Sequence, residues 1–132
     1  MLTFFCPNCW HRIAENAKQC LYCGFDLNKL DGLSYDERLV MSLRHSISEY
    51  RITAARILGQ HGAVIALPEF KRIVDMERDY YLLKEVLFAL LSIPDPMSVE
   101  LMKQATRHPS KLVSRLAQEL LIRLEASHSQ AP

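Results

Sequence analysis

The chain has 132 residues, of which 49% are hydrophobic, and a formal net charge of +1 at pH 7, which indicates one globular unit of modest size and not a disordered tail. No apolar run reaches the ~20 residues of a membrane-spanning helix, and the N-terminal MLTFF has neither a basic leader nor an apolar core long enough for a secretory signal. We therefore expect a cytoplasmic protein that does not cross a membrane.

The first predicted element is a cysteine-rich segment. The only four cysteines of the chain form two Cys-x-x-Cys pairs, Cys6 with Cys9 and Cys20 with Cys23. In the reducing cytoplasm such pairs bind a metal or exchange electrons more often than they form disulfides. A thioredoxin-like redox site would place one pair at the start of a helix, whereas here each of two pairs is followed by turn-like sequence. The pattern favours a metal site, with disulfides, redox chemistry or four unrelated buried cysteines as the alternatives.

This spacing suits one zinc ion. Two-residue spacing lets both thiolates of a pair reach the same ion, and two pairs complete a tetrahedron of four sulfurs. Such a site leaves no coordination position open, so we expect the zinc to be structural and not to activate water. A segment of about thirty residues cannot bury enough apolar surface to fold alone, and structural zinc contributes an apparent ~10–16 kcal/mol to coupled folding.

The residues of this segment resemble those of the short bacterial zinc ribbons. The matching parts are Cys6-Pro7-Asn8-Cys9, the ten-residue spacer 10–19, and Cys20-Leu21-Tyr22-Cys23-Gly24. The resemblance implies an N-terminal domain, residues 1–30, built of short β-hairpins around one structural Zn²⁺. The family's usual glycine after the first pair is Trp10 here, so that turn either accepts a side chain or has a changed backbone. His11 is an alternative ligand, although four cysteines already complete the site.

Residues 34–127 follow the polar stretch DLNKLDGLS and are predicted to form six helices. Apolar residues recur at helical spacing as far as about Ala126, with short turn signals between the periodic segments. The predicted helices span residues 35–45, 48–60, 63–76, 79–92, 96–107 and 110–126. The start signals are capping boxes at Ser34 with Glu37 and Ser46 with Glu49, an N-cap at Asp95 before Pro96, and an N-cap at Ser110.

The helical region contains an internal repeat. The segments YRITAARILG (50–59), LKEVLFALLS (83–92) and VSRLAQELLI (113–122) superimpose without gaps at offsets of 33 and 30 residues. A period near 30 made of two helices is typical of an α-solenoid, in which each helix pair buries its apolar face by stacking on its neighbours. We therefore expect a mostly α fold with about three helix pairs behind the cysteine segment.

The first of these segments resembles the short bacterial HEAT-like repeats, including those called phycobilisome-lyase HEAT repeats. The positions that match that family's consensus are Tyr50-Arg51, Ala54-Ala55, Leu58-Gly59 and Ala66-Leu67-Pro68. The resemblance implies a HEAT-like domain over residues 34–127. The second and third copies lack the alanine pair and the glycine, so for them the assignment rests on the periodicity.

The two regions are joined by residues 24–34 only, so the ribbon lies near the first helix. We expect aromatic side chains of the ribbon to pack against that helix or its neighbour. The candidates are Phe4, Phe5, Trp10 and Phe25. The alternative is two modules that fold and move independently.

No catalytic pattern is found. The sequence has no phosphate-binding glycine loop and no His-Glu-x-x-His, and its carboxylates alternate with Lys and Arg as on a solvated helix face. HEAT-like repeats also occur in lyases that act on bilins, but about three helix pairs offer little concave surface to enclose a tetrapyrrole. We therefore expect no enzyme activity and no small-molecule substrate.

Nucleic-acid binding is the main alternative function, because zinc ribbons in transcription and translation proteins bind RNA or DNA. The balance of 16 Lys and Arg against 15 Asp and Glu gives no net attraction to phosphate. A local basic row is the exception, since Arg51 and Lys84 occupy nearly equivalent repeat positions. Three further residues would lie near this row: Arg44, Arg56 and Arg115.

The hypothesis that we favour is a non-catalytic, zinc-binding adaptor that binds an unidentified protein through its HEAT-like surface. Tyrosine and arginine are enriched at the centres of protein interfaces. The candidate contact residues are Tyr50, Arg51, Tyr80, Tyr81, Lys84 and Phe88. Adjacent residues on a helix point in different directions, so one of Tyr80 and Tyr81 should be partly exposed.

Overall fold

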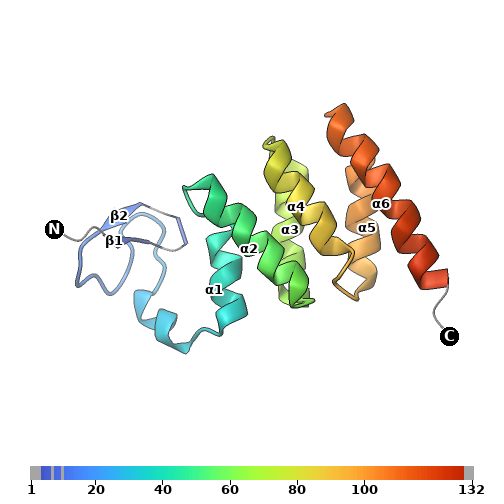
Figure 1. The fold of residues 1–132 in the computed structure, drawn as a ribbon. Coiled ribbons are helices and arrows are strands. Elements are labelled where there is room, and N and C mark those ends of the chain that lie inside the picture. Colours follow the sequence, from blue (N-terminus) through green and yellow to red (C-terminus); the bar gives the residue numbers. More distant parts are fainter. Residues whose placement is uncertain (1–3, 7, 10, 130–132) are drawn as a thin grey trace.

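The computed structural model describes residues 4–6, 8–9 and 11–129, and this part of the chain is mostly helical (Figure 1). The helices are α1 (Tyr35–Ser42), α2 (Ser48–Gln60), α3 (Leu67–Met76), α4 (Tyr80–Leu90), α5 (Pro96–Ala105) and α6 (Lys111–Ser129). Among these described helices, none combines the length and the apolar composition needed to cross a bilayer. The prediction of a mostly α fold with six helices is confirmed.

The region before α1 contains little regular structure. Strand β1 (Phe4–Phe5) pairs antiparallel with β2 (Arg12–Ile13), and an isolated antiparallel bridge joins Gln19 to Asp26. A short 3₁₀ helix, η1 (Leu27–Gly32), leads into α1. Each of the two antiparallel pairings brackets one Cys-x-x-Cys pair.

Side-chain caps explain where several helices begin. Ser34 and Glu37 form the predicted capping box, in which each backbone N–H donates to the other residue's side-chain oxygen at 3.1 Å. Asp95 caps α5 with Pro96 in the first turn, and the Ser110 hydroxyl accepts a backbone N–H at the start of α6. These bonds satisfy donors that have no partner inside the helix.

The capping box predicted at Ser46 is wrong. The N-cap of α2 is Ile47, which makes no side-chain cap, and its own N–H donates to Nδ1 of His45 at 2.9 Å. The helix predicted to run to residue 45 ends at Ser42, and a turn closed by the His45 N–H and the Ser42 carbonyl follows it. The turn places Ser46 outside α2, so its hydroxyl does not cap the first turn.

The helices pack as successive pairs. Contacts join α1 to α2, α3 to α4 and α5 to α6, and α2, α4 and α6 also contact one another in sequence order. In Figure 1 these three helices lie side by side, with α3 and α5 behind them. They begin at Ser48, Tyr80 and Lys111, so successive starts are 32 and then 31 residues apart. The helix starts therefore follow a two-helix period close to the one found in the sequence.

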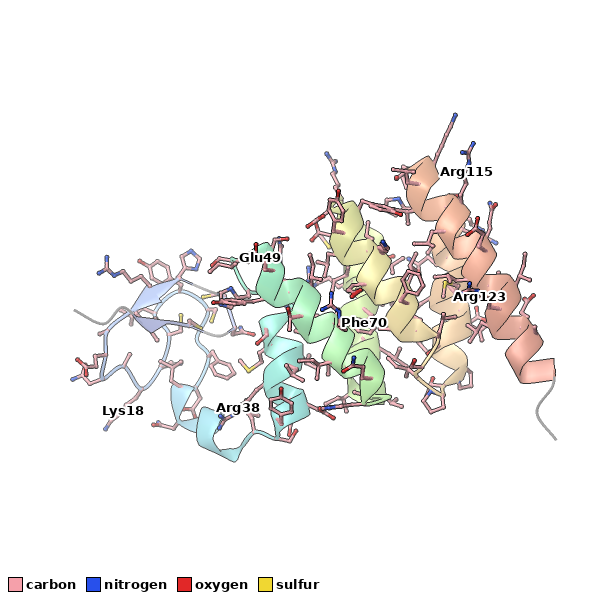
Figure 2. All side chains as sticks on the ribbon, viewed as in Figure 1. Lys18, Arg38, Glu49, Phe70, Arg115 and Arg123 are labelled. Atoms are coloured by element: carbon pink, nitrogen blue, oxygen red, sulfur yellow. The ribbon has the colours of Figure 1, made fainter. Side chains whose placement is uncertain are left out.

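The hydrophobic core lies between the helices of these pairs. Phe70 of α3, labelled in Figure 2, is fully buried, and the largest other fully buried side chains come from all three pairs and include Leu43, Leu58, Leu87 and Met102. Gly59 of α2 approaches Ala89 of α4 so closely that an added Cβ would lie 2.7 Å from the Ala89 Cα. A residue without a side chain is therefore needed at this helix crossing.

Candidate metal centre and exposed helix surface

Four cysteine sulfurs converge in the region before α1. All of them lie within 4.8 Å of one another, with 3.7 Å between the sulfurs of Cys6 and Cys23 and 3.6 Å between those of Cys9 and Cys20. Four sulfurs placed at about 2.3 Å from a tetrahedral ion are about 3.8 Å apart. The cluster is therefore compatible with binding one metal ion.

The two loops that carry the cysteines have the same backbone hydrogen bond. The Cys6 N–H donates to the His11 carbonyl, and the Cys20 N–H donates to the Phe25 carbonyl, both at 2.9 Å. Each bond joins the first cysteine of a pair to the residue five positions later. The two loops thus share this hydrogen bond, and their sulfurs lie close together.

Gly24 closes the second loop. Its φ of +80° lies in the left-handed region that favours glycine, and its N–H donates to the Cys20 carbonyl at 2.9 Å. The equivalent position of the first loop is Trp10, which lies outside the described residues. The prediction that this turn either tolerates a side chain or has a changed backbone therefore stays a prediction.

Backbone N–H groups of the loops donate to all four sulfurs. The donors are Asn8 and Cys9 for Cys6, His11 for Cys9, Tyr22 and Cys23 for Cys20, and Phe25 for Cys23. Such bonds stabilise the thiolate, which is the form that binds a metal. The pattern repeats from one loop to the other, so every sulfur of both pairs accepts at least one backbone N–H.

Two side chains complete the surroundings of the cluster. The amide of Asn8 donates to the Cys23 sulfur at 3.5 Å and so connects the two loops. Nδ1 of His11 lies 3.3 Å from the Cys9 sulfur, and the His11 ring stacks on Tyr22 with 4.3 Å between ring centroids. Among the described residues the ligand group consists of the four cysteines alone, so His11 is placed as a neighbour of Cys9 and not within that group.

The four thiols have unequal pKa values when no ion neutralises them. The Asn8 amide, helped by the Phe25 N–H, lowers the pKa of Cys23 to about 6. The His11 N–H lowers the pKa of Cys9, but desolvation and the three neighbouring sulfurs outweigh it and raise this pKa to about 12. Four thiolates this close repel one another, and a divalent cation removes that repulsion.

A cavity of about 510 Å³ lies where the cysteine region meets the helices. Its lining residues are Asn8, Phe25, Leu33, Ser34, Glu37, Val40, Met41 and Ile65. Phe25 therefore faces the same cavity as side chains of α1. Trp10 and the side chains of Phe4 and Phe5 lie outside the part of the chain that is described, so their packing on α1 stays a prediction.

Three of the predicted contact residues share one face of α4. Tyr81, Lys84 and Phe88 are exposed and are spaced by three and four positions, which places them in one stripe. Tyr80 is half-buried against the core, whereas Tyr81 is 70% exposed. The prediction that one of these adjacent tyrosines is exposed is confirmed.

The other two predicted contact residues point elsewhere. The ring of Tyr50 packs edge-on against His45, in the loop before α2, with 4.6 Å between ring centroids. The guanidinium of Arg51 is half-buried, with Nη1 3.8 Å from a Glu77 carboxylate oxygen and a buried Nε that has no hydrogen-bond partner. The structure therefore does not bring these two side chains to the stripe on α4.

The neighbouring helix α6 carries exposed residues that were not predicted from the sequence, among them Leu112 and Arg123, beside Arg115, which was placed near the basic row. Leu112 is 62% exposed, and Arg115 and Arg123 are also exposed; both arginines extend from α6 in Figure 2. The signal was present in the repeat, because Tyr81 and Leu112 are each the second residue of their helix. Individually these residues look like an ordinary solvated helix surface, and the contact of α4 with α6 is visible only in the structure.

The comparisons with known proteins add no assignment to this geometry. No protein-family model matches the chain, no curated protein matches it, and no solved structure matches it. The mostly helical fold and the four-sulfur cluster are thus established from the structure itself.

Proposed function

We propose that the protein is a non-catalytic, zinc-binding adaptor of the cytoplasm that binds a protein partner through its helices. In this proposal residues 1–30 form a zinc ribbon of the short bacterial kind around one structural Zn²⁺. Residues 34–127 form a HEAT-like solenoid of three helix pairs. The metal orders one end of the molecule, and the other end presents the surface to which the partner binds.

The choice of zinc is supported by the donor set and its geometry. Cys6, Cys9, Cys20 and Cys23 offer only thiolates, which favour zinc or iron over magnesium or calcium. The sulfur separations of 3.6 and 3.7 Å suit a closed tetrahedral site. Such a site holds the metal without an open position for substrate, which favours a structural role. The chain's own contribution is to hold the four sulfurs and to donate N–H groups to them.

The solenoid arrangement is supported by the regular packing. The helices that begin at Ser48, Tyr80 and Lys111 contact one another in sequence order, and each also contacts the helix before it. The close crossing of α2 and α4 at Gly59 falls on a glycine of the HEAT-like consensus. A stack of this kind leaves one face of every second helix uncovered, which is the usual binding surface of repeat proteins.

The adaptor role is supported chiefly by one observation, the exposure of large apolar side chains on neighbouring helices. Tyr81 and Phe88 of α4 and Leu112 of α6 are exposed, with Phe88 at 37%. Aromatic residues on a rigid, uncovered surface are typical of protein interfaces. The charges favour protein over nucleic acid, because three members of the basic row are in ion pairs: Arg44 with Glu69, Arg51 with Glu77 and Arg56 with Glu85.

The experiment combines a metal assay with affinity capture. Elemental analysis of the purified, reduced protein should find one zinc per chain. One iron per chain would support a metal site at the four cysteines but contradict the choice of zinc. Capture from lysate with the intact chain should retain a defined protein, and Tyr81→Ala with Phe88→Ala should reduce that capture while the helical circular dichroism stays unchanged.

The matched control for capture is Tyr35→Ala, since Tyr35 is similarly exposed but lies on α1. If Tyr35→Ala reduced capture of the partner as much as the α4 variants do, a binding surface on α4 would be contradicted. Retention of RNA or DNA that is released by salt, without a protein partner, would replace the adaptor by the nucleic-acid function.

A further inference from the structure

The exposed side of α4 and α6 forms one surface. On α4, Tyr81, Lys84 and Phe88 recur at i, i+3 and i+7, opposite the buried Leu83 and Val86. Since α4 packs against α6 along the same layer, the uncovered side of α4 continues onto α6. The stripe on α4 therefore does not end at the edge of its own helix.

The corresponding stripe of α6 is formed by Leu112, Arg115 and Glu119, also at i, i+3 and i+7, with Arg123 one turn further. The buried residues of α6 lie on the other side of the helix: Val113, Ala117, Leu120 and Leu124. We call the combined surface the α4/α6 face, and its members are Tyr81, Lys84, Phe88, Leu112, Arg115, Glu119 and Arg123.

The charge of this face is net positive, with Lys84, Arg115 and Arg123 against Glu119. Within the described part of the chain no ion pair is formed by Lys84, Arg115 or Arg123. Glu119 is the acidic residue of the α6 stripe. Glu85, on the α2 side of α4, is already paired with Arg56 at 2.7 Å. A partner that complements the face must therefore bring negative charge.

The shape and the apolar content of the face suit a helix. Tyr81, Phe88 and Leu112 offer large apolar surface on two packed helices, and the surface between parallel helices accepts the ridge of a third. A helical segment presents apolar anchors at i, i+3 or i+4, and i+7 on one side and can carry acidic residues beside them. Single-stranded nucleic acid would also use cations and aromatic rings, but it gains nothing from Leu112 and is repelled by Glu119.

We propose that the α4/α6 face binds an acidic amphipathic helix of a partner protein, with apolar anchors against Tyr81, Phe88 and Leu112. Carboxylates that flank these anchors pair with Lys84, Arg115 and Arg123. This inference rests on the proposed adaptor function and specifies the chemistry of the partner. The charges set the orientation of the helix and the rate of association, and the apolar anchors hold it in place.

The test starts from an unbiased peptide library displayed against the intact, zinc-loaded chain. The enriched peptides should carry apolar residues at helical spacing with at least two acidic residues beside them. One enriched peptide, labelled with a fluorophore, then gives dissociation constants by anisotropy at low and at physiological salt. Because an exposed ion pair contributes up to about fivefold in affinity, the triple variant Lys84→Glu, Arg115→Glu, Arg123→Glu should bind more than about tenfold more weakly.

The matched control reverses two exposed cations away from the face, Lys18→Glu before α1 and Arg107→Glu after α5. This control should keep the affinity within about twofold, and both variants should keep the helical circular dichroism. The proposal is overturned if the library yields no binder, if the enriched peptides are basic, or if a single-stranded oligonucleotide binds in their place. The proposal is also overturned if the triple variant binds the enriched peptides as tightly as the wild type does. That result leaves the adaptor function intact, because the peptides then bind at another surface.

Discussion

The cysteine region and the helical region are held together by different interactions. Among the side chains described before α1, the buried ones are Cys6 and Cys20, which are themselves candidate metal ligands. From α1 onward the buried side chains form an apolar cluster that includes Phe70, Leu87 and Met102. Among the side chains that the structure describes, the first region thus buries only sulfurs, whereas the second buries an apolar cluster without any metal ligand. The comparison teaches that one chain can combine a part whose buried side chains are candidate metal ligands with a part whose buried side chains are apolar. We therefore expect only the first part to depend on an ion.

Metal removal gives the largest expected contrast between the two regions. A chelator, or Cys20→Ser, should remove the apparent ~10–16 kcal/mol that structural zinc contributes to coupled folding, so that residues 11–32 lose hydrogen-exchange protection. The helical circular dichroism should change little, because the apolar cluster begins at Leu43, just after α1, and consists of residues of the helical region. Glu15→Gln is the control, since Glu15 is exposed in the same region. Unchanged protection after complete metal removal would contradict the dependence on an ion.

A change confined to the helical core should lower the stability of the helices and leave metal binding unchanged. Gly59→Ala places a Cβ 2.6 Å from the Cβ and 2.7 Å from the Cα of Ala89, and overpacking of this kind costs about 1–3 kcal/mol. Denaturant unfolding measures the loss, while zinc content should stay at the wild-type value. Gly32→Ala is the matched control, because an added Cβ at Gly32 meets nothing within 4 Å. Equal stability of Gly59→Ala and the control would show that α2 and α4 are not in close contact there.

The first turn of α1 lies where the two regions join, and its cap gives a smaller effect. Ser34→Ala removes the hydroxyl that accepts the Glu37 N–H and should lower the free energy of unfolding by about 0.5–2 kcal/mol. Ser46→Ala should leave it nearly unchanged, because Ser46 does not cap α2. A comparison of the two variants by chemical denaturation tests the corrected boundary directly. If Ser46→Ala lowered the free energy of unfolding as much as Ser34→Ala, the capping box that the sequence predicted at Ser46 would be supported after all.

The smallest expected effect is a pH dependence that belongs to the helical region alone. Burial would raise the pKa of Glu69, but hydrogen bonds from Arg44 and Arg72 outweigh it and lower this pKa below its ordinary value. A carboxylate with a lowered pKa in the folded state contributes stability above its unfolded pKa and loses it as the pH falls through the folded value. Unfolding of Glu69→Gln between pH 6 and pH 3 should therefore depend less on pH than unfolding of the wild type. Equal slopes would contradict the ion pairs.

The sequence predicted the elements of the helical region well because most of their signals are local. Ser34, Asp95 and Ser110 act within one turn of the chain, and each caps the predicted helix. The prediction of a cap at Ser46 was wrong because the turn after α1 decides where α2 begins. In that turn the Ile47 N–H donates to Nδ1 of His45. That turn depends on how α1 packs, which a local pattern does not contain.

The candidate sites were predictable to different extents for the same reason. The spacing of Cys6, Cys9, Cys20 and Cys23 already implies that their sulfurs can meet, and the structure brings them within 4.8 Å. The exposed surface was only partly predicted. Whether Arg51 points outward or toward Glu77, and whether Leu112 lies beside α4, depends on contacts between helices that are far apart in the sequence.

The contacts between sulfurs of different loops have a consequence for how the N-terminal region folds. Sulfurs of different loops lie close together, at 3.7 Å from Cys6 to Cys23 and 3.6 Å from Cys9 to Cys20. A bound ion would therefore tie the two loops together, in addition to the hydrogen bond from the Asn8 amide to the Cys23 sulfur. We expect these segments to become ordered in a single cooperative step, with no populated intermediate in which one is formed and the other is not.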